Sequence, residues 1–359
     1  MKKWNYRVLG VMSGTSLDGI DLAVIEFRLT DIWNFKILSS ELIPYSSTWV
    51  RKLSSAISLD DFQLSEFNRS YTTYLSEVIF QFKKMHPIDC AGLDAVCSHG
   101  HTIKHEPENE LTLQIGNLPE LATLTQETVV CDFRVQDVEL GGQGAPLVPI
   151  GDELLFSDYN FCLNLGGFAN ISTKINSERR AFDICAVNTV LNFYSQKMGS
   201  PFDDGGKIAA SGKLIPELSE ALNSLPFYEQ NPPKSLGIEW VYSVVFPILK
   251  KYENDIPSLL HTYSVHIADQ IVKVLDNKPE SKVLITGGGA FNTFLIQKII
   301  EKTKSEILIP SEEIINYKEA IIFGFLGVLK LRNEVNVLQS VTGAVKDHSS
   351  GKIFLPSDC

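Results

Sequence analysis

The feature that most constrains the fold is a glycine-rich loop between two strand-like segments near the N-terminus. Within residues 5–27, the apolar segments RVLGVM and IDLAVIEF flank the loop SGTSLDG. This pattern predicts a β-hairpin with an unusually polar turn. A second glycine turn, GGFAN, follows the strand-like residues 161–165 and precedes the strand-like segment ISTKI. We therefore expect two lobes of α/β type, each with a hairpin closed by glycines.

The remaining periodic segments occur in a similar order in the two halves. In the first half we expect a strand at 35–43, a helix at 60–85 and a short buried strand at 93–98 that ends in HGHT. The second half predicts a strand at AFDIC, helices at 189–198 and 259–275, a strand at 282–286 running into GGGAFN, a helix from 293 and a strand at 306–309. A duplicated lobe is the simplest account of this repetition.

The length of 359 residues exceeds one typical domain core, which also favours two lobes. The boundary is expected near the glycine- and proline-rich segment GGQGAPLVP at 141–149. We divide the chain into an N-terminal lobe at 1–133 and a C-terminal lobe at 134–334. The tail at 335–359 is expected to complete the first lobe.

Bulk properties indicate a cytoplasmic protein. The longest apolar run, at 321–329, is interrupted by glycines and falls short of the roughly 20 residues that cross a bilayer, and the N-terminus lacks the apolar stretch of a secretory leader. The cysteines are scattered without paired spacing, which favours free thiols in a reducing compartment. They are Cys90, Cys97, Cys131, Cys162, Cys185 and Cys359. The formal charge of −11 argues against a nucleic-acid partner.

The loop within Gly10–Asp21 is suited to phosphate binding. Glycines remove side-chain bulk, and backbone amides and the hydroxyls of Ser13, Thr15 and Ser16 can face an anion. The carboxylate of Asp18 would then require a cation between itself and the phosphates, so we expect Mg²⁺ held partly through water. The loop is not a Walker A motif, because isoleucine stands where lysine is required. An ordinary hairpin turn is the alternative interpretation.

Two further glycine segments fit a nucleotide. The turn at 165–170 matches the position of the first loop, so that two glycine hairpins could hold the phosphates from both sides of a cleft. The segment Gly287–Gly289 lies between a strand and a helix, where the backbone can approach a nucleotide. It resembles a dinucleotide-binding turn only loosely, because the spacing fails at Asn292. NAD is therefore not the expected cofactor.

Asp183 is the best candidate for a general base. The strand-like AFDIC places this carboxylate directly before a predicted helix, and activation of an attacking oxygen requires such a group. A helix-capping role is equally consistent with the local sequence. Asp203 and Asp204 compete for the same assignment, although a helix cap is expected for at least one of them.

Histidines cluster at the end of the predicted strand at 93–98. His99, His101 and His105 have a spacing that can bind zinc, so a zinc-dependent hydrolase using His99 and His101 is an alternative function. The rest of the chain offers no second obvious pair of ligands. The simpler interpretation is a polar strand end that lines the cleft.

Several long motifs together resemble the anhydro-N-acetylmuramic acid kinase family. They include GVMSGTSLDGID, SHGHTIKH, GGQGAPLVP, NLGGFANIS, FDDGGKIAASG and ITGGGAFN. The resemblance implies a two-lobed actin-like (ribonuclease H-like) ATPase fold with duplicated mixed β-sheet cores and a central cleft. It also implies an ATP-dependent kinase, using Mg²⁺, that hydrolytically opens 1,6-anhydro-N-acetylmuramic acid and forms N-acetylmuramic acid 6-phosphate in cell-wall recycling. The family further implies a homodimer.

The resemblance also assigns residues. Asp183 corresponds to the aspartate that deprotonates the attacking water, and Arg134, Glu319 and Asn188 fall in the sugar pocket. Arg134 could bind an oxyanion through its planar fork or form an ordinary salt bridge. The residues matched to ATP binding are Gly14, Thr15, Ser16, Leu17, Asp18, Gly19, Ile20, Asp21, Gly166, Gly167, Asn170, Gly287, Gly288 and Gly289.

The chain departs from the family pattern near the acceptor site. The family usually reads Phe-Asp-Thr-Gly-Pro-Gly-Asn around its base, whereas residues 182–188 read FDICAVN. After PPKS the family commonly has Gly-Arg-Glu, but here Ile238 follows Gly237. These changes leave open a kinase for a different amino or anhydro sugar. An ATP-binding regulator that phosphorylates no sugar is a third interpretation.

Overall fold

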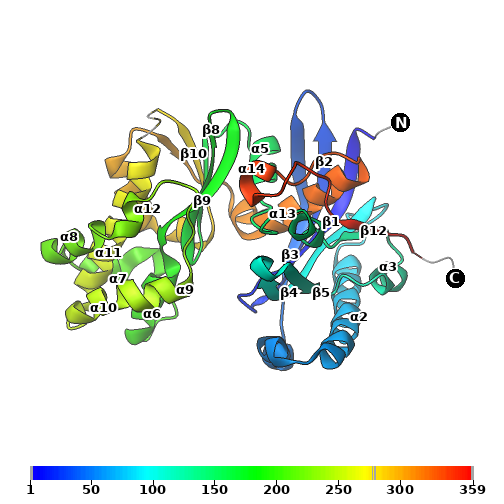
Figure 1. Cartoon of the computed structure of the whole chain (residues 1–359), viewed down its shortest axis with the longest axis horizontal. Helices are drawn as coiled ribbons and strands as arrows, with labels where there is room; N and C mark the ends of the chain where they lie inside the picture. Colours follow the sequence, from blue (N-terminus) through cyan, green and yellow to red (C-terminus); the bar gives the residue numbers. More distant parts are fainter. Residues whose placement is uncertain (1–2, 277, 279, 357–359) are drawn as a thin grey trace. The chain divides into compact units, whose positions relative to one another are not determined.

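The computed structural model describes residues 3–276, 278 and 280–356, and the chain separates into two compact units. Unit 1 contains the chain up to Leu155 and again from Tyr317, and unit 2 contains Phe156–Asn316. Figure 1 labels most of the helices and strands of both units. Cys359 lies outside the described residues, and the five other cysteines are buried free thiols.

Unit 1 is built on a mixed sheet of seven strands in the order β12-β6-β4-β1-β2-β3, with β5 paired to β4. The first three strands form an antiparallel meander, and β4 and β6 then add to β1 in parallel. The short β12 closes the other edge by pairing with β6. The strands are β1 Asn5–Ser13, β2 Gly19–Leu29, β3 Trp33–Pro44, β4 Ala95–Glu106, β5 Leu111–Ile115, β6 Val129–Cys131 and β12 Lys352–Phe354.

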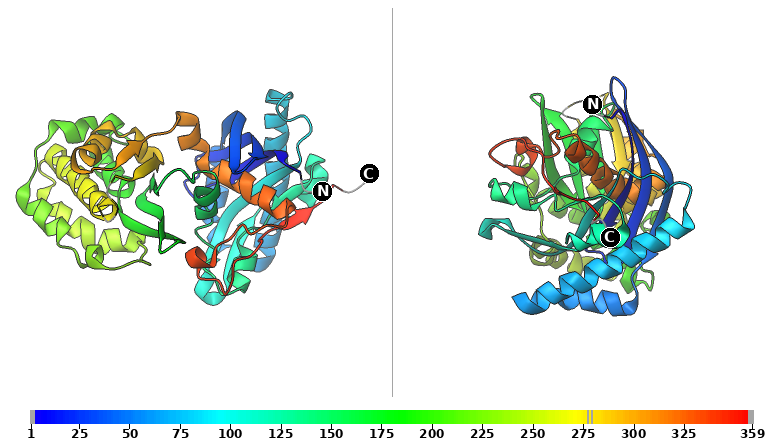
Figure 2. Two further views of the ribbon diagram at one scale, coloured as in Figure 1. Left: turned by 90° about the horizontal axis from the view of Figure 1, so that it is seen from above. Right: turned by 90° about the vertical axis from the view of Figure 1, so that its right-hand side faces the viewer.

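Helices cover both faces of this sheet. The long helix α2 packs against the face that carries Leu9 and Val11, and α13 packs against the face that carries Val8 and Ile25. Alternation of side chains along β1 and β2 places apolar groups on both faces. Both helices can be followed in Figure 2, α2 in light blue and α13 in orange. The helices are α1 Ser47–Ser55, α2 Asp61–Met85, α3 Glu120–Thr125, α4 Val135–Glu139, α5 Pro149–Leu154, α13 Glu312–Leu331 and α14 Gln339–Thr342.

The sheet of unit 2 repeats the central order of the first one. Its five strands follow the order β11-β10-β7-β8-β9. Again three strands form an antiparallel meander and two more add in parallel beside the first. The strands are β7 Phe161–Leu165, β8 Phe168–Ile175, β9 Glu178–Ala186, β10 Lys282–Thr286 and β11 Glu306–Leu308.

The main core of unit 2 lies between this sheet and its helices, chiefly the buried helix α11. The helices are α6 Asn188–Lys197, α7 Lys207–Ser211, α8 Pro216–Asn223, α9 Ile238–Trp240, α10 Phe246–Leu249, α11 Ile256–Leu275 and α12 Thr293–Lys302. Short 3-10 segments in the two units are η1 Ala56–Ser58, η2 Pro107–Asn109, η3 Asp204–Gly206, η4 Pro226–Glu229, η6 Lys250–Tyr252 and η7 Gly288–Phe291, and η5 Val241–Val245 is a π-helical turn.

Most predicted elements are present, several with ends shifted by one or two residues, and two differences change the place of a candidate residue. The strand expected at 93–98 continues to Glu106, so HGHT lies inside β4 because β5 pairs with its second half. Asp183 lies inside β9 and does not cap the next helix, because β9 runs on to Ala186 and α6 begins with no side-chain cap. None of the helices among residues 3–276, 278 and 280–356 is long and apolar enough to span a bilayer.

The chain passes from unit 1 to unit 2 at Phe156 and returns to unit 1 at Tyr317. The boundaries expected from the sequence were 134 and 335. Packing explains the difference. Leu147 and Ile150 join the same apolar cluster as Ile321 and Leu329, beneath the sheet of unit 1. The carboxylate of Asp137, in α4, also accepts a hydrogen bond from the Thr342 hydroxyl at 2.7 Å.

Candidate active site

In unit 1, the hairpin of β1 and β2 carries the predicted phosphate loop. Thr15, Ser16 and Asp18 are exposed at its tip. The Asp18 carboxylate accepts hydrogen bonds from the Ser16 hydroxyl at 2.7 Å and the Gly19 amide at 3.0 Å. Leu17 adopts a positive φ of 60°. Ile20 is fully buried in the core, so only its backbone can face a ligand.

Gly19 fixes the base of this loop. A Cβ at this position would lie 2.5 Å from the carbonyl oxygen of Ile43 in the neighbouring strand β3. A side chain would therefore force β2 and β3 apart. At Gly14 the nearest atom, the Ser16 hydroxyl, would be 3.4 Å away, so the tip itself is open.

A buried chain of hydroxyl groups holds the loop from below. The Ser13 Oγ lies 2.6 Å from the Tyr45 hydroxyl and 2.7 Å from His101 Nδ1. Tyr45 in turn lies 2.5 Å from the hydroxyl of Tyr71, which belongs to α2. Burial lowers the pKa of His101 to about 4, so the imidazole is neutral near pH 7. This network ties the end of β1 to β4 and α2, and sequence patterns gave no sign of it.

Three carboxylates and one guanidinium belong to the same unit. Burial, then the charges of Asp18 and Glu319, raise the pKa of Asp21 to about 7. Burial also raises the pKa of Glu319, against the influence of Arg134. Burial lowers the pKa of Arg134 to about 10, and Glu319 opposes this change. Mutual repulsion of the acids favours a cation beside them.

Arg134 is oriented by a neutral histidine. Its Nε donates to His99 Nε2 at 2.9 Å, and its Nη1 donates to the carbonyl oxygen of Gly144 at 2.6 Å. The other ring nitrogen of His99 lies 2.9 Å from the carbonyl oxygen of Gly100. His99 therefore donates through Nδ1 and accepts through Nε2. One ring nitrogen therefore contacts Arg134, and the other fixes the ring to the backbone.

The predicted histidine cluster accordingly does not form a zinc site. Both nitrogens of His99 have partners, and Nδ1 of His101 contacts Ser13. Within residues 3–276, 278 and 280–356, no group of three or more His, Cys, Asp and Glu side chains is placed to hold a metal ion by itself. The arrangement fits a positioning role for the histidines. It also leaves a cation at Asp18 in need of ligands from a bound phosphate or water.

In unit 2, two glycine segments pack against each other. β7 and β10 are parallel neighbours, so the turn after Leu165 meets Gly287–Gly289 at one edge of the sheet. Gly287 has φ +79°, and a Cβ there would lie 2.4 Å from Asn164 Oδ1. A Cβ on Gly289 would lie 2.6 Å from that of Leu165. The glycines thus permit close backbone packing at the strand ends.

Asn188 joins this group at the start of α6. Its side chain donates to the carbonyl oxygen of Leu165 at 3.1 Å, and its amide donates to that of Gly166 at 3.2 Å. Gly167 has no room for a side chain, because a Cβ would lie 2.8 Å from Thr189 Oγ1. The predicted residues Gly166, Gly167, Asn188 and Gly287–Gly289 are therefore brought together.

A cavity of about 480 Å³ opens beside these glycines within unit 2. Gly288, Asn188 and Asn192 contribute polar groups to it, and Phe202 and Phe291 contribute rings that are both partly exposed. A planar base can stack on such rings. Asn192, Phe202 and Phe291 were not singled out from sequence, because an aromatic residue in a loop carries no distinctive pattern.

Asp203 and Asp204 have structural partners in this region. The Asp203 carboxylate accepts from the amides of Ile208 and Ala209, in the first turn of α7, at 2.7 and 2.9 Å. Asp203 thus binds amides of α7 without being its N-cap residue, which is Gly206. Asp204 forms an exposed ion pair with Lys207. Neither contact leaves these acids as well placed for base chemistry as Asp183.

Asp183 lies on β9 directly opposite Asn170 on β8. Its Oδ2 accepts a hydrogen bond from the Leu236 amide at 2.8 Å, and its own amide donates to the Lys234 carbonyl oxygen at 3.0 Å. Burial raises its pKa, and the bond from Leu236 opposes that rise. A partly buried carboxylate with one oxygen fixed and a raised pKa is suited to accept a proton.

The repeated sheets, each a hairpin meander extended by parallel strands, define a two-lobed α/β chain of the actin-like, ribonuclease H-like ATPase fold. The family model described as anhydro-N-acetylmuramic acid kinase matches residues 6–356. The chain therefore belongs to the anhydro-N-acetylmuramic acid kinase family and is an ATP-dependent sugar kinase. This confirms the resemblance noted in its motifs.

Two relatives that carry the family's name agree with this membership. The chain is 32% identical to anhydro-N-acetylmuramic acid kinase of Francisella tularensis subsp. novicida (strain U112), over 96% of this chain and 97% of that protein. It is 31% identical to the Bacillus cereus (strain AH187) protein of the same name, over 98% and 99%. Component A of the Acidaminococcus fermentans (R)-2-hydroxyglutaryl-CoA dehydratase matches with a TM-score of 0.49 and 12% identity, over 91% and 99% of the two chains.

Proposed function

We propose that the chain phosphorylates 1,6-anhydro-N-acetylmuramic acid at O6 with ATP while water opens the anhydro bridge. The product is N-acetylmuramic acid 6-phosphate, formed as cell-wall sugars are recycled in the cytoplasm, and the enzyme acts as a homodimer. The observation that carries this proposal is Asp183, a partly buried carboxylate with a raised pKa and one oxygen held by the Leu236 amide. Membership of the family supplies the sugar.

In the proposed reaction a water molecule attacks C1 of the sugar. Asp183 takes one proton from this water, and the remaining hydroxyl forms the new bond to C1. The bond between C1 and the bridging O6 breaks, and its electron pair stays on O6. O6 then attacks the γ-phosphorus of ATP, the bond to the β-phosphate oxygen breaks, and ADP leaves. The proton on Asp183 is returned to solvent.

The residues of unit 1 would bind the phosphates. Residues 14–18 are exposed or partly exposed at the loop tip, where backbone amides and the Thr15 hydroxyl can donate to phosphate oxygens. Asp18 and Asp21 would hold Mg²⁺ together with those oxygens, because the acids lie close enough for Asp18 to raise the pKa of Asp21. When bound, the ion would neutralise charge on the transferred phosphoryl group.

Arg134 and Glu319 would bind the acceptor sugar. Because His99 and Gly144 already fix Nε and Nη1 of Arg134, its remaining guanidinium edge would reach the lactyl carboxylate. In unit 2, Asn188 would contact the sugar, and Asn170 lies opposite Asp183. The residues of this unit that would contact the nucleotide are Gly166, Gly167, Gly287, Gly288 and Gly289.

The test is an acceptor screen with ATP and Mg²⁺. The proposal expects 1,6-anhydro-N-acetylmuramic acid to be converted to a 6-phosphate, with one ADP formed for each product molecule. A kinase for another amino or anhydro sugar is the second candidate, favoured by the changed residues Ile184–Val187 beside Asp183. No product from the anhydro sugar, beside an active family member run in parallel, would defeat the substrate assignment.

A further inference from the structure

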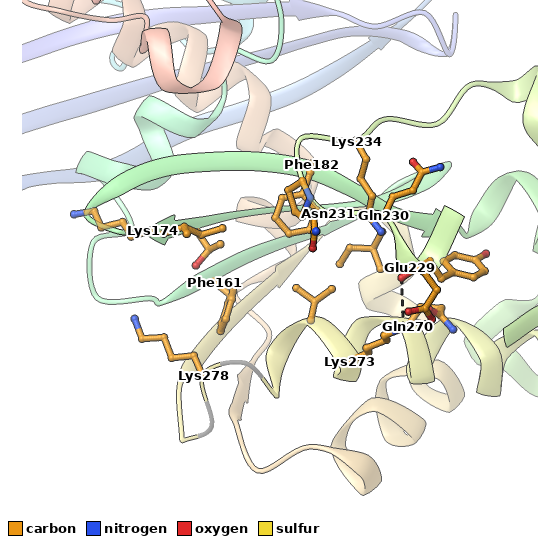
Figure 3. A pocket seen from close by; sticks show the side chains of 16 residues that line it. Phe161, Lys174, Phe182, Glu229, Gln230, Asn231, Lys234, Gln270, Lys273 and Lys278 are labelled. Carbon is orange, nitrogen blue, oxygen red and sulfur yellow. Dashed lines mark hydrogen bonds and ion pairs between the residues drawn. The ribbon is translucent and has the colours of Figure 1, made fainter. Parts of the chain in front are cut away.

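A second cavity of unit 2 lies outside the residues assigned above. It has a volume of about 540 Å³ and is bounded by β7, β8, β9, α11 and the segment 228–234. Figure 3 shows the side chains that line it. We call it the lysine pocket and define it by its rim of Lys174, Lys234, Lys273 and Lys278. Its volume falls within the range of about 300–1,000 Å³ that small organic ligands occupy.

The floor of the lysine pocket is apolar. Phe161, Phe182 and Ile184 are buried side chains of the sheet, and Val274 of α11 lines the opposite wall. In Figure 3, Phe161 and Phe182 lie inside the ring of polar side chains. Aromatic rings offer flat surfaces on which an apolar or planar body can pack. The floor alone would therefore favour an apolar molecule.

The rim is positively charged. Lys174 belongs to β8, and Lys273 belongs to α11. Lys234 lies in the 228–234 segment, and Lys278 follows α11. Glu229 is the acid among the lining residues, and it pairs with Lys273 at 2.7 Å. In Figure 3, Lys174 and Lys278 lie at one end of the pocket, away from that ion pair. The lining as a whole has four lysines and one glutamate, and this excess of cationic groups suits an anionic ligand.

The charge at Lys234 supports the same conclusion. Burial and then the charge of Lys273 lower the pKa of Lys234. Its Nζ donates to the Phe227 carbonyl oxygen at 3.2 Å and lies 4.6 Å from the centre of the Phe227 ring. Glu229 already opposes part of this repulsion, because its charge raises the pKa of Lys234, and a bound anion would oppose more of it. An apolar floor beneath a cationic rim matches an amphipathic anion.

The pocket also shares its wall with the support of Asp183. Along β9, Phe182 and Ile184 face the lysine pocket, and Asp183 between them faces the other side of the sheet. The segment that carries Asn231 and Lys234 lines the pocket, and the same segment binds the Asp183 backbone at Lys234 and its carboxylate at Leu236. A ligand that moves this segment would move the group that holds Asp183.

We propose that the lysine pocket binds a small organic anion with an apolar or planar body, and that its occupancy changes turnover at Asp183 through residues 230–236. Binding of the anion does not depend on the proposed reaction. The effect on turnover rests on the proposed function, because it requires Asp183 to act in catalysis.

The binding half is tested with 8-anilinonaphthalene-1-sulfonate, an aromatic sulfonate whose fluorescence rises in apolar surroundings. The titration uses the full chain with saturating ADP and Mg²⁺, so that the nucleotide cavity is filled. We expect one molecule bound per chain. The double variant Lys174→Gln/Lys278→Gln should weaken binding by about fivefold or more, as expected for loss of two partly exposed charge contacts. Val274→Trp, which fills the floor, should abolish binding.

The matched control is Lys250→Gln/Lys251→Gln, which removes two exposed lysines of η6 outside the pocket. It should leave the titration unchanged. Circular dichroism of every variant checks that the fold is retained. No binding to the unsubstituted chain, or equal binding by the control, Lys174→Gln/Lys278→Gln and Val274→Trp, overturns the site.

The second half is tested by turnover at saturating probe. We expect kcat to change while KM for ATP stays the same, and the change to disappear in Val274→Trp. An unchanged kcat, or a change that persists in Val274→Trp, overturns the coupling to Asp183. Failure of the chain to phosphorylate any anhydro sugar would instead defeat the proposed function, and the binding result would stand.

Discussion

The two glycine hairpins have the same topology and different chemistry. The hairpin of unit 1 ends in an open loop with exposed hydroxyls and a carboxylate, and the buried Ser13, Tyr45 and His101 hold its base. The hairpin of unit 2 ends in the two residues Gly166 and Gly167, packed tightly against the start of α6. A repeated sheet can therefore present polar groups to an anion in one copy and bare backbone beside a proton acceptor in the other.

The largest expected effect concerns Asp183, the acid on β9 beside the unit 2 hairpin. Replacing Asp183 by Asn should lower kcat by about 10³-fold, as expected for loss of a general base, with ATP affinity unchanged. Steady-state kinetics and calorimetric titration of ATP measure the two quantities. Asp158→Asn, at an exposed acid of the same unit, is the control. Unchanged turnover in Asp183→Asn would remove the base assignment.

A second prediction tests the tight packing of the unit 2 hairpin. Gly287→Ala should destabilise the protein by about 3 kcal/mol, because the residue combines a positive φ with a steric clash. Gly199 is the matched control, since it has φ +84° and a Cβ added there would meet no atom within 4 Å. Gly199→Ala should cost about 1 kcal/mol. Equal losses in thermal or denaturant unfolding would show that packing against Asn164 contributes nothing.

A third prediction concerns the acids of the unit 1 hairpin. The pKa of Asp21 is about 7 when folded and near its usual 3.8 when unfolded, so the folded state binds an extra proton between these values. Stability is therefore greatest at low pH in this window and falls as pH rises through about 7. Asp21→Asn should remove this loss of stability. The full difference between the two pKa values corresponds to about 4 kcal/mol, and we expect about half of it, about 2 kcal/mol, as the gain in the free energy of unfolding at pH 8.

The measurement is denaturant unfolding at several pH values without nucleotide. At pH 4 the Asn variant and the unsubstituted chain should have nearly equal free energies of unfolding. Asp31→Asn, at an exposed acid of the same unit, is the control variant. A difference that stays constant from pH 4 to pH 8 would contradict the raised pKa of Asp21.

The smallest expected effect concerns the support beneath the phosphate loop. Ser13→Ala removes contacts to both Tyr45 and His101 and should raise KM for ATP about fivefold, equivalent to roughly 1 kcal/mol. Tyr45→Phe keeps the contact between Ser13 and His101, so its effect should be smaller. If Ser13→Ala binds ATP normally, the network stabilises the fold without shaping the loop.

Local sequence was sufficient where one segment determines its own structure. The helix at 61–85 begins at Asp60, which forms a capping box with Gln63, and acidic residues at that point predicted its start. The strands at 161–165 and 282–286 match their predicted bounds. Glycines between apolar segments likewise predicted both hairpins, because few other residues permit such turns.

Features that depend on distant segments were not predictable. The contact between Ser13 and His101 requires β4 to pair with β1 in one register, which no local pattern specifies. Asp183 was expected to precede a helix, but the distant residues Lys234 and Leu236 bind it within a strand. The borders of the two units also follow packing between residues near 150 and residues near 325.

The central claim is that Asp183 activates water at C1 while the released bridge oxygen takes the phosphoryl group. The most direct test uses 1,6-anhydro-N-acetylmuramic acid with ¹⁸O in the anhydro bridge, followed by ³¹P NMR of the product. The account predicts that the label lies between C6 and phosphorus, where it shifts the phosphorus signal. A phosphate ester without the label would show that the bridge oxygen stays bound to C1, and this result would contradict the mechanism.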